Sequence, residues 1–479
     1  MKHLTLDVKA LQELPLLSQT ARAQILQELE ERRRACRRKI VVLDDDPTGT
    51  QTVHDISVYT DWEQETLLAA FREPGSLFYI LTNSRSFSAS ETEAVHRVIG
   101  ERVAQAAQAC GFDFILISRG DSTLRGHYPL ETQTLRRAVE ATCGKRYDGE
   151  IIFPFFAEGG RYTLNNIHYV QEKDRLIPAG QTEFANDKTF GYSASDLCGW
   201  CEEKTAGEYP ASQVTAISLQ QLRAGDVQAI ERQLAAVSGF GKVIVNAVNY
   251  DDVAVFLCGF FRALQQGKEF LFRSAASLVK TIGGVAEQPL LDSRSILVPN
   301  AQTGGLVIVG SHVRKTTLQL NDLQNSGLPL AFIQYDQHKV LQEGGLRQET
   351  EKAAAQAMEL MAQGKTAVVF TRRDRLDLEG ASPEEQLKMS TEISDAIVQV
   401  VEKLTLQPRF LVAKGGITSS DIATKALRIW RAKVMGQVEP GIPVWQAGPE
   451  SKFPGMAYVI FPGNVGSEQT LTQVVSKLL

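Results

Sequence analysis

The sequence is poor in cysteine. Its 479 residues include six cysteines, which are too few and too widely spread for a disulfide framework, and this agrees with a reducing cytoplasm. Cys198 and Cys201 form its one CxxC pair. The preceding run 193–196 is a helix-capping sequence, so we interpret the pair as structural. No second CxxC pair supplies further ligands for zinc.

Long apolar segments are also missing. No segment approaches the roughly 18 apolar residues of a membrane-spanning helix. Charged residues at Lys2, Asp7, Lys9 and Glu13 interrupt any apolar leader at the N-terminus. We therefore expect a cytoplasmic protein that neither carries a standard export signal nor has a membrane partner.

Positive charge is not in excess. The 51 Lys and Arg residues against 56 Asp and Glu residues give a formal net charge of −5. A negative protein repels a phosphate backbone, so nucleic acid is not an expected partner. The basic run 32–39 follows leucines and glutamates at helical spacing, and we interpret it as a solvated helix end.

Two common nucleotide-binding motifs are absent as well. Neither GxxxxGK[ST] nor GxGxxG occurs, which argues against P-loop ATPases and ordinary dinucleotide-binding domains. What the sequence does have is ordinary globular composition, with 43% hydrophobic and 22% charged residues. Because single cores stop growing near roughly 250–300 residues, a chain of this length predicts two domains.

Short β-branched or aromatic runs alternate with longer amphipathic stretches, a pattern typical of βαβ units around a mostly parallel sheet. The runs are 40–43, 77–81, 114–117, 151–153 and 243–245 in the first half and 306–309, 330–333, 367–370, 410–413 and 457–461 in the second. Turn formers without periodicity fill 282–303, where we place the domain junction. We predict a helical N-terminal extension over 1–39 and two doubly wound α/β domains, over 40–282 and 304–479, with an active-site cleft between them.

Ligands bind open α/β sheets beyond the carboxyl ends of the strands, and charged residues follow the first four runs. Three adjacent carboxylates, Asp44 to Asp46, raise one another's pKa unless a cation relieves them, which suits a general base or a magnesium site. Arg85, the loop 118–126 and Arg161 come after the next three runs. A guanidinium can pair both oxygens of a carboxylate. Arginines at three adjacent strand ends therefore predict one small anionic ligand.

Glycine replaces charge at the strand ends of the second half. The loops 310–312, 414–420 and 462–466 follow three of its runs. Backbone N–H groups that glycine leaves accessible at a helix N-terminus bind phosphate. These loops together predict a nucleotide-binding domain.

In this order along residues 40–466, the loops resemble the four-carbon acid sugar kinase family, whose members have a sugar-binding N-terminal domain and a nucleotide-binding C-terminal domain. The family motif Asp-Asp-x-Thr-Gly resembles 45–49, and the motif Lys-x-Asp-Ser-Thr-x-Arg-Gly is similar to 119–126. The remaining matches are Ser84-Arg85, Ser311, 415–418 and Gly463-Asn464.

The resemblance implies ATP and Mg²⁺ as cofactors. The candidate substrate-binding residues are Asp45, Asp46, Arg85, Arg119, Gly120, Asp121, Ser122, Arg125 and Arg161. The candidate nucleotide-binding residues are Ser311, Gly415, Gly416, Ile417, Thr418, Gly463 and Asn464. Three features depart from the family pattern: Arg119 replaces a usual Lys, Ile417 replaces a usual acidic residue, and the N-terminal extension lies outside it.

Our hypothesis is transfer of the ATP γ-phosphoryl group to a terminal hydroxyl of a small sugar acid such as threonate, erythronate or 3-oxo-tetronate. Asp46 is the predicted catalytic base, with Asp45 and Asp121 as alternatives. A metal-dependent lyase or phosphatase acting through 44–46 is a rival that leaves the glycine loops unexplained. A non-catalytic ligand-binding regulator is the third hypothesis. The sequence is compatible with a homodimer and names no metal ligands.

Overall fold

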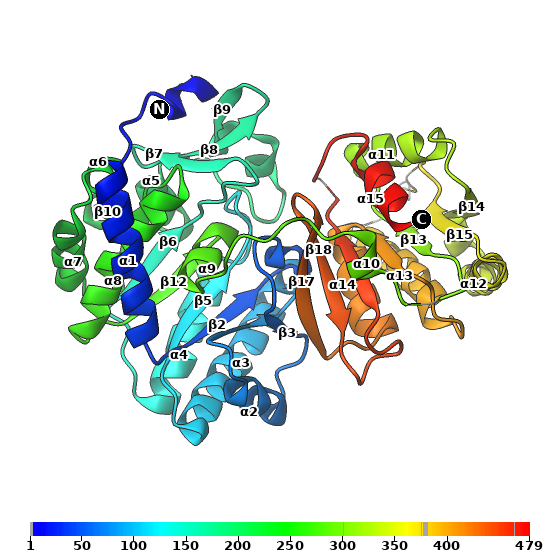
Figure 1. Ribbon diagram of the computed structural model, residues 1–479, viewed down its shortest axis with the longest axis horizontal. Coiled ribbons are helices and arrows are strands. Elements are labelled where there is room, and N and C mark those ends of the chain that lie inside the picture. Colours follow the sequence, from blue (N-terminus) through cyan, green and yellow to red (C-terminus); the bar gives the residue numbers. More distant parts are fainter. Residues whose placement is uncertain (1–2, 300, 375, 377–381, 464) are drawn as a thin grey trace. The chain divides into compact units, whose positions relative to one another are not determined.

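The computed structural model describes residues 3–299, 301–374, 376, 382–463 and 465–479 (Figure 1). Contacts divide the chain into two compact units: unit 1 consists of 1–45 and 61–287, and unit 2 of 46–60 and 288–479. The chain thus leaves unit 1 between Asp45 and Asp46, returns after Thr60 and leaves again after Glu287. Among the described helices, none combines the length and apolar character needed to cross a bilayer.

A parallel sheet forms the centre of unit 1, in the order β10-β11-β6-β12-β5-β2-β4. Its strands are β2 (Lys39–Asp44), β4 (Leu77–Leu81), β5 (Phe114–Arg119), β6 (Gly149–Phe153), β10 (Thr215–Ile217), β11 (Gly241–Val245) and β12 (Phe270–Ser274). The five apolar runs predicted in this half are strands. Their Val, Ile and Leu side chains are buried because helices cover both faces.

Most helices of unit 1 lie between these strands in sequence, with α1 before the first strand and α9 after the last, which confirms the α/β class. They are α1 (Gln19–Ala35), α2 (Gln64–Arg72), α3 (Ala89–Cys110), α4 (Leu130–Cys143), α5 (Leu197–Lys204), α6 (Leu219–Arg223), α7 (Val227–Ala236), α8 (Tyr250–Gln265) and α9 (Ala276–Ile282). Asp196 caps α5, so Cys198 and Cys201 lie inside a helix, and both thiols are buried and free.

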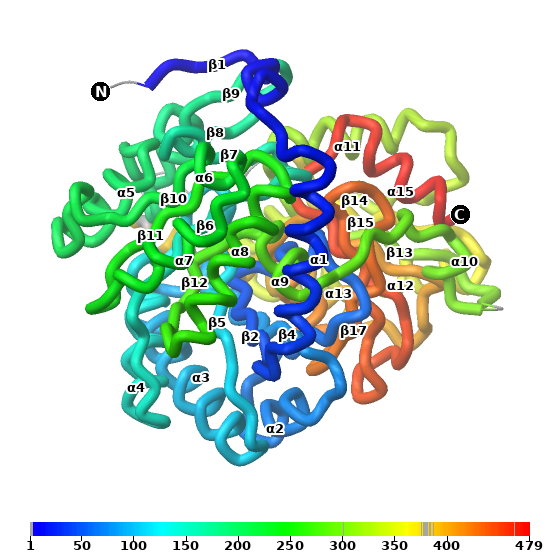
Figure 2. Tube along the Cα trace, turned by 60° about the vertical axis from the view of Figure 1, so that its left-hand side comes forward, coloured from blue at the N-terminus to red at the C-terminus, as the bar shows by residue number. Residues whose placement is uncertain are grey.

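The N-terminal extension contains the short 3₁₀ helix Val8–Leu11 and the longer helix α1, Gln19–Ala35. Helix α8 is apolar on nearly every face, so it needs cover on its outer side, and α1 lies along it there (Figures 1 and 2). Ile25 and Leu29 of α1 are buried, and Glu28 forms an ion pair with Arg262 at 2.8 Å. Before α1 the chain adds β1 (Leu6–Asp7) to an antiparallel sheet ordered β1-β9-β8-β7, whose other strands are β7 (Arg161–Leu164), β8 (Ile167–Glu172) and β9 (Arg175–Pro178).

Unit 2 is built on a mixed sheet in the order β3-β17-β18-β19-β16-β13-β15-β14. The strands from β19 to β14 are parallel, and β3, β17 and β18 extend the sheet in antiparallel fashion. These strands are β3 (Ser57–Tyr59), β13 (Leu306–Val309), β14 (Leu330–Tyr335), β15 (Thr366–Thr371), β16 (Leu411–Lys414), β17 (Arg431–Glu439), β18 (Ile442–Ala447) and β19 (Ala457–Phe461). All five apolar runs predicted for this half are strands.

Helices on this sheet complete unit 2. They are α10 (Ser293–Ile296), α11 (Arg314–Gln324), α12 (Gly345–Ala362), α13 (Pro383–Glu402), α14 (Gly416–Asp421) and α15 (Thr470–Leu478). Helix α14 continues directly into a π-helical turn, Ile422–Ala426. The hairpin of β17 and β18 was not among the predicted strands, because its alternating polar and apolar residues leave no continuous apolar run.

Each sheet has a point where the chain reverses its direction of strand addition. In unit 1 the connection after β2 leads to β4 on one side, and the connection after β5 leads to β6 on the other. In unit 2 the same reversal falls between β13 and β16. Crevices open at such points beyond the carboxyl ends of the strands, so these two places are the expected ligand sites.

Candidate active site

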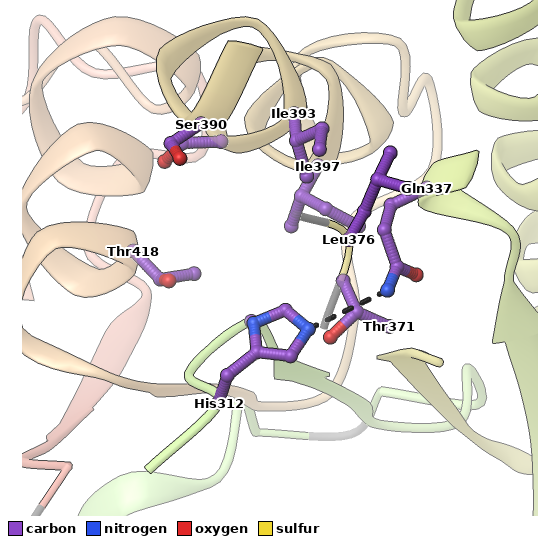
Figure 3. Close-up of a pocket in the computed structure, with 10 residues that line it drawn as sticks. His312, Gln337, Thr371, Leu376, Ser390, Ile393, Ile397 and Thr418 are labelled. Atoms are coloured by element: carbon purple, nitrogen blue, oxygen red, sulfur yellow. Dashed lines mark hydrogen bonds between the residues drawn. The ribbon is translucent and has the colours of Figure 1, made fainter. Parts of the chain in front are cut away.

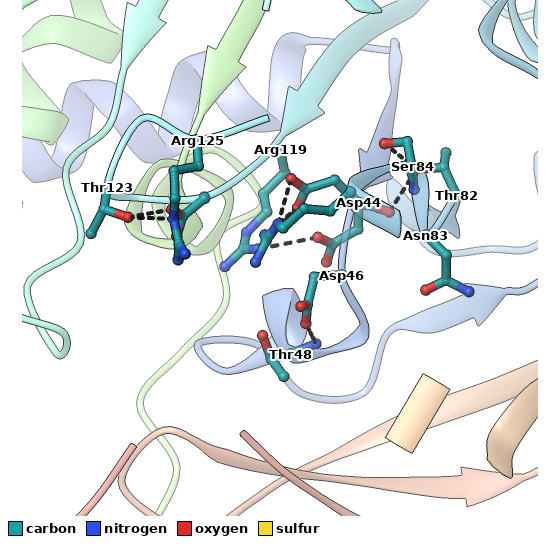
Figure 4. Close-up of polar contacts among 12 residues, drawn as sticks. Asp44, Asp46, Thr48, Thr82, Asn83, Ser84, Arg119, Thr123 and Arg125 are labelled. Atoms are coloured by element: carbon teal, nitrogen blue, oxygen red, sulfur yellow. Dashed lines mark hydrogen bonds and ion pairs between the residues drawn. The ribbon is translucent and has the colours of Figure 1, made fainter. Parts of the chain in front are cut away.

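Asp44 and Arg119 end the two strands at the reversal point of unit 1. They are paired in register between β2 and β5, and Arg119 Nη1 lies 3.2 Å from Asp44 Oδ1 (Figure 4). Both side chains are almost fully buried. A buried ion pair of this kind persists only when both charges are compensated, so Arg119 is held in place before any ligand arrives.

Asp45 forms a bidentate ion pair with Arg85. The guanidinium donates from Nε to Oδ2 at 3.1 Å and from Nη2 to Oδ1 at 2.6 Å. Burial raises the pKa of Asp45, and the charge of Glu131 adds to this effect while Arg85 and Arg273 oppose it. A carboxylate with a raised pKa is a better proton acceptor, so the structure keeps Asp45 chemically suitable as a base.

The loop after β5 folds around a second carboxylate, Asp121. Arg125 Nε donates to Asp121 Oδ2 at 2.7 Å, and the hydroxyl of Thr123 donates to the same oxygen (Figure 4). Burial opposes ionisation of Asp121, but the charges of Arg125 and Arg85 outweigh it and hold its pKa far below the usual range. Such a carboxylate is a poor proton acceptor. This favours Asp45 or Asp46 over Asp121 as the base.

Arg161 is the first residue of β7 and shares an aromatic contact with Arg125. Its guanidinium and that of Arg125 both face the ring of Phe184, at 5.8 and 5.0 Å from the ring centre. Ser122 is fixed through its carbonyl, which lies 2.8 Å from His168 Nε2. The structure therefore brings all candidate substrate-binding residues of unit 1 to the carboxyl edge of one sheet.

Asp46 belongs to unit 2. It caps the short 3₁₀ helix Pro47–Thr50, where Oδ1 accepts from the N–H of Thr48 at 2.8 Å (Figure 4). A β-carbon placed on Gly416 would lie 3.1 Å from Asp46 Oδ2. The carboxylate of the predicted base thus lies beside the loop predicted to bind phosphate.

The glycine loops of unit 2 converge at its reversal point. A β-carbon on Gly310 would lie 2.5 Å from Thr418 Oγ1, and one on Gly415 would lie 3.1 Å from Cβ of Ser311. A β-carbon on Gly463 would lie 3.4 Å from Ser311 Oγ. Only glycine leaves backbone this close together and this accessible, and the first N–H groups of α14 have no intrahelical partner. Ile417 in the same turn is 62% exposed, and the predicted residue Asn464 lies outside the described residues.

Lys414 stabilises these loops through its side chain. Its buried ammonium donates to the carbonyls of Pro462 and Gly463, and it lies 4.2 Å from the ring centre of Phe461. Burial, with the charge of Lys315, lowers the pKa of Lys414 to about 7. The sequence placed Lys414 at the start of a glycine loop but gave it no role.

A cavity of about 240 Å³ adjoins the glycine loops. Ile393 and Ile397 of α13 form one side of it, and His312 and Thr371 at the strand ends form the other (Figure 3). Arg373, just past β15, donates to the carbonyl of Ser311 at 2.6 Å. Arg373 was not among the predicted residues, although it follows an apolar run as Arg85 does.

Comparison with known families agrees with this geometry. The family described as the sugar-binding N-terminal domain matches residues 40–282, and the family described as the nucleotide-binding C-terminal domain matches residues 306–471. The chain belongs to the four-carbon acid sugar kinase family. Within the family's N-terminal match, residues 46–60 pack with unit 2.

Solved structures show how widely the fold of this family is shared. A Salmonella typhimurium LT2 protein provisionally named a tRNA synthase is similar with a TM-score of 0.63 at 16% identity, over 91% of this chain and 98% of that one. A Haemophilus influenzae protein of the DUF1537 family is similar with a TM-score of 0.57 at 16% identity, over 92% of this chain and 100% of that one. At this low sequence identity, the structural similarity shows a common fold alone. No curated protein matches the sequence.

Proposed function

We propose that this protein is an ATP-dependent kinase that phosphorylates a terminal hydroxyl of a small sugar acid, with threonate, erythronate and 3-oxo-tetronate as the first candidates. The observation that carries the proposal is the position of Asp46. Its carboxylate lies beside Gly416, where three glycine loops offer backbone donors to phosphate. A carboxylate there can orient an attacking hydroxyl and accept its proton.

Unit 1 supplies the groups that suit the acid. Arg85, Arg119, Arg125 and Arg161 gather at the carboxyl edge of its sheet, and a short sugar acid carries one carboxylate and several hydroxyls that such groups can bind. The aspartates that pair with Arg85, Arg119 and Arg125 keep those three in place before substrate binds. In this proposal the substrate carboxylate shares or replaces those contacts.

Unit 2 supplies the groups that suit the nucleotide. Ser311, Gly415 and Gly463 face one another, and the adjoining cavity with its isoleucine wall suits a nucleoside better than a second charged group. Thr418, with its hydroxyl beside Gly310, can donate to a phosphate oxygen. Phosphoryl transfer asks mainly for such positioning and charge neutralisation.

Magnesium usually accompanies ATP in such reactions. Among the described residues, no group of three His, Cys, Asp or Glu side chains is placed to hold a metal. Mg²⁺ commonly takes only one or two carboxylates, with phosphate oxygens and waters completing its shell, so an ion held on the phosphates of ATP needs no such cluster. Bound there, the ion would neutralise charge on the phosphates.

An ADP-release assay across four- and five-carbon aldonates and their oxo derivatives tests the proposal. We expect acid-dependent ADP formation with at least one member, and a phosphorylated acid as the other product. ATP binding without acid-dependent turnover for any member would contradict it. Release of inorganic phosphate from a phosphorylated acid without nucleotide would point instead to the rival phosphatase.

A further inference from the structure

A fifth arginine lies at the carboxyl edge of the sheet of unit 1. Arg273 comes from β12, between β5 and β6, and is 4% exposed. It lies inside a strand and not in a loop that follows one. A guanidinium buried in a sheet needs compensating contacts, and these contacts indicate what it does.

Arg273 contacts both ends of the loop 120–126. Nη2 donates to the carbonyl of Arg125 at 2.9 Å. A β-carbon on Gly120 would lie 1.8 Å from Nη1 and 2.3 Å from Cζ, and one on Gly126 would lie 3.2 Å from Nη2. The guanidinium therefore occupies the space that the missing side chain of Gly120 leaves, and the loop curves around it.

Two carboxylates border the same point. A β-carbon on Gly126 would also lie 3.6 Å from Asp45 Oδ2 and 3.9 Å from Glu131 Oε2. The positive charge of Arg273 thus offsets the negative charges of two buried acids. Arg85, Arg119 and Arg125 each pair with an aspartate, whereas Arg273 Nε has no hydrogen-bond partner among the described residues. Its hydrogen bond goes to the carbonyl of Arg125, in the backbone of the loop.

We propose that Arg273 is a positioning residue for acid binding: its guanidinium fills the space at Gly120 and holds the loop 120–126 in the shape that presents Arg119 and Arg125 to the substrate. The proposal rests on the proposed kinase function. It adds Arg273, which contacts the loop 120–126, to the residues that determine acid binding. Gly120 then has a steric role. Its φ lies outside the left-handed region, so the guanidinium is what excludes a side chain there.

A double-mutant cycle of Gly120→Ala and Arg273→Ala tests this directly. Gly120→Ala should displace the guanidinium and raise KM for the acid at least about tenfold, with KM for ATP changed less than about twofold. Arg273→Ala should do the same. The double variant should lose no more than either single variant, because the methyl group added at position 120 no longer meets a guanidinium. Losses that multiply would overturn the proposal.

Arg223→Ala is the matched control. Arg223 is also buried in unit 1, at 8% exposure, and pairs with Asp252 at 2.6 Å. Its loss should lower the melting temperature without raising KM for the acid. Guanidinium ions at millimolar concentration should partly restore acid KM in Arg273→Ala and leave Arg223→Ala unchanged. Equal acid KM effects in the two variants would reduce Arg273 to a packing role and refute the proposal.

Failure of the kinase function would appear differently. In that case wild-type protein would release no ADP with threonate, erythronate or 3-oxo-tetronate, and none of the three acids would shift its melting temperature. If wild-type protein turns over an acid while the Arg273 and Gly120 variants keep normal KM, the kinase stands and the positioning role is refuted.

Discussion

At the scale of single residues, the arginines of unit 1 are engaged before substrate arrives. Arg85 forms an ion pair with Asp45, and Arg119 forms one with Asp44, so each guanidinium is already paired. The sequence identified these residues as anion binders because each follows a strand. It could not reveal the pairing, since the partners come from different strands that only the fold aligns. Pairing also fixes the rotamers, which lowers the entropy lost on binding.

Replacing Asp46 by Asn should preserve folding and nucleotide binding. It should lower kcat by at least about a hundredfold, the usual scale for a positioned acid–base group. The cap on Thr48 survives, because the amide oxygen of Asn can still accept its N–H. Steady-state kinetics beside nucleotide titration check this, and near-normal turnover would remove Asp46 from the mechanism.

Arg119→Lys is the informative change at the strand end. It keeps the charge beside Asp44 but loses the planar fork, so KM for the acid should rise about tenfold while KM for ATP stays nearly constant. Arg119→Ala should raise KM for the acid further, so that kcat/KM for the acid falls by up to about a hundredfold. It should also lower stability by about 3 kcal/mol, because it breaks a buried ion pair. An effect chiefly on ATP would assign Arg119 to the phosphates instead.

At the scale of elements, the parallel strands could be predicted because strands buried on both faces carry continuous apolar runs. Strand β12 was not predicted, because the polar residues Arg273 and Ser274 follow its apolar run Phe270–Phe272 within the strand. Arg273 was absent from the predicted site for the same reason, because it lies inside a strand that was not predicted. The convergence of the glycine loops could be predicted as a class of site, but contact between Asp46 and the Gly416 turn could not. It depends on the segment 46–60, which packs with unit 2 although both of its neighbours in sequence belong to unit 1.

The turn from β16 into α14 should tolerate no side chain at Gly416. A β-carbon there would already lie 3.1 Å from Asp46 Oδ2, so Gly416→Ala should cost several-fold in ATP affinity and Gly416→Val more than about tenfold. KM for the acid should change little. Titration calorimetry of the two variants checks the graded loss, and unchanged affinity in both would make the turn structural.

Lys414 gives the nucleotide loops a pH dependence. With its pKa lowered to about 7, the ammonium is charged below that pH and neutral above it. Bound phosphate favours the charged form, so nucleotide binding should take up a proton, and Kd should rise by up to about tenfold between about pH 7 and 8.5. Lys414→Met should bind more weakly at pH 6.5 and lose much of this slope. Parallel pH profiles in both proteins would contradict the assignment.

At the scale of the whole molecule, the N-terminal extension is part of unit 1. Leu29 of α1 is 3% exposed and Leu26 is 41% exposed, which gives a matched pair on one helix. Leu29→Ala should cost about 2–4 kcal/mol and lower the melting temperature by a few degrees, whereas Leu26→Ala should leave it nearly unchanged. Equal shifts in thermal denaturation would mean that α1 is not held on α8 as described.

The excursion of residues 46–60 into unit 2 has a practical consequence for dissecting the protein. Strand β3 covers one edge of β17, with Ala432 opposite Val58, and Trp445 Nε1 donates to Thr50 Oγ1 at 2.9 Å. A fragment that starts at Gln288 would therefore carry a bare β17 edge, and exposed edges recruit strands from other molecules. Such a fragment should self-associate, and a synthetic peptide of residues 46–60 should suppress this by refilling the edge. Cutting the gene between the two halves thus separates unit 2 from one of its own strands.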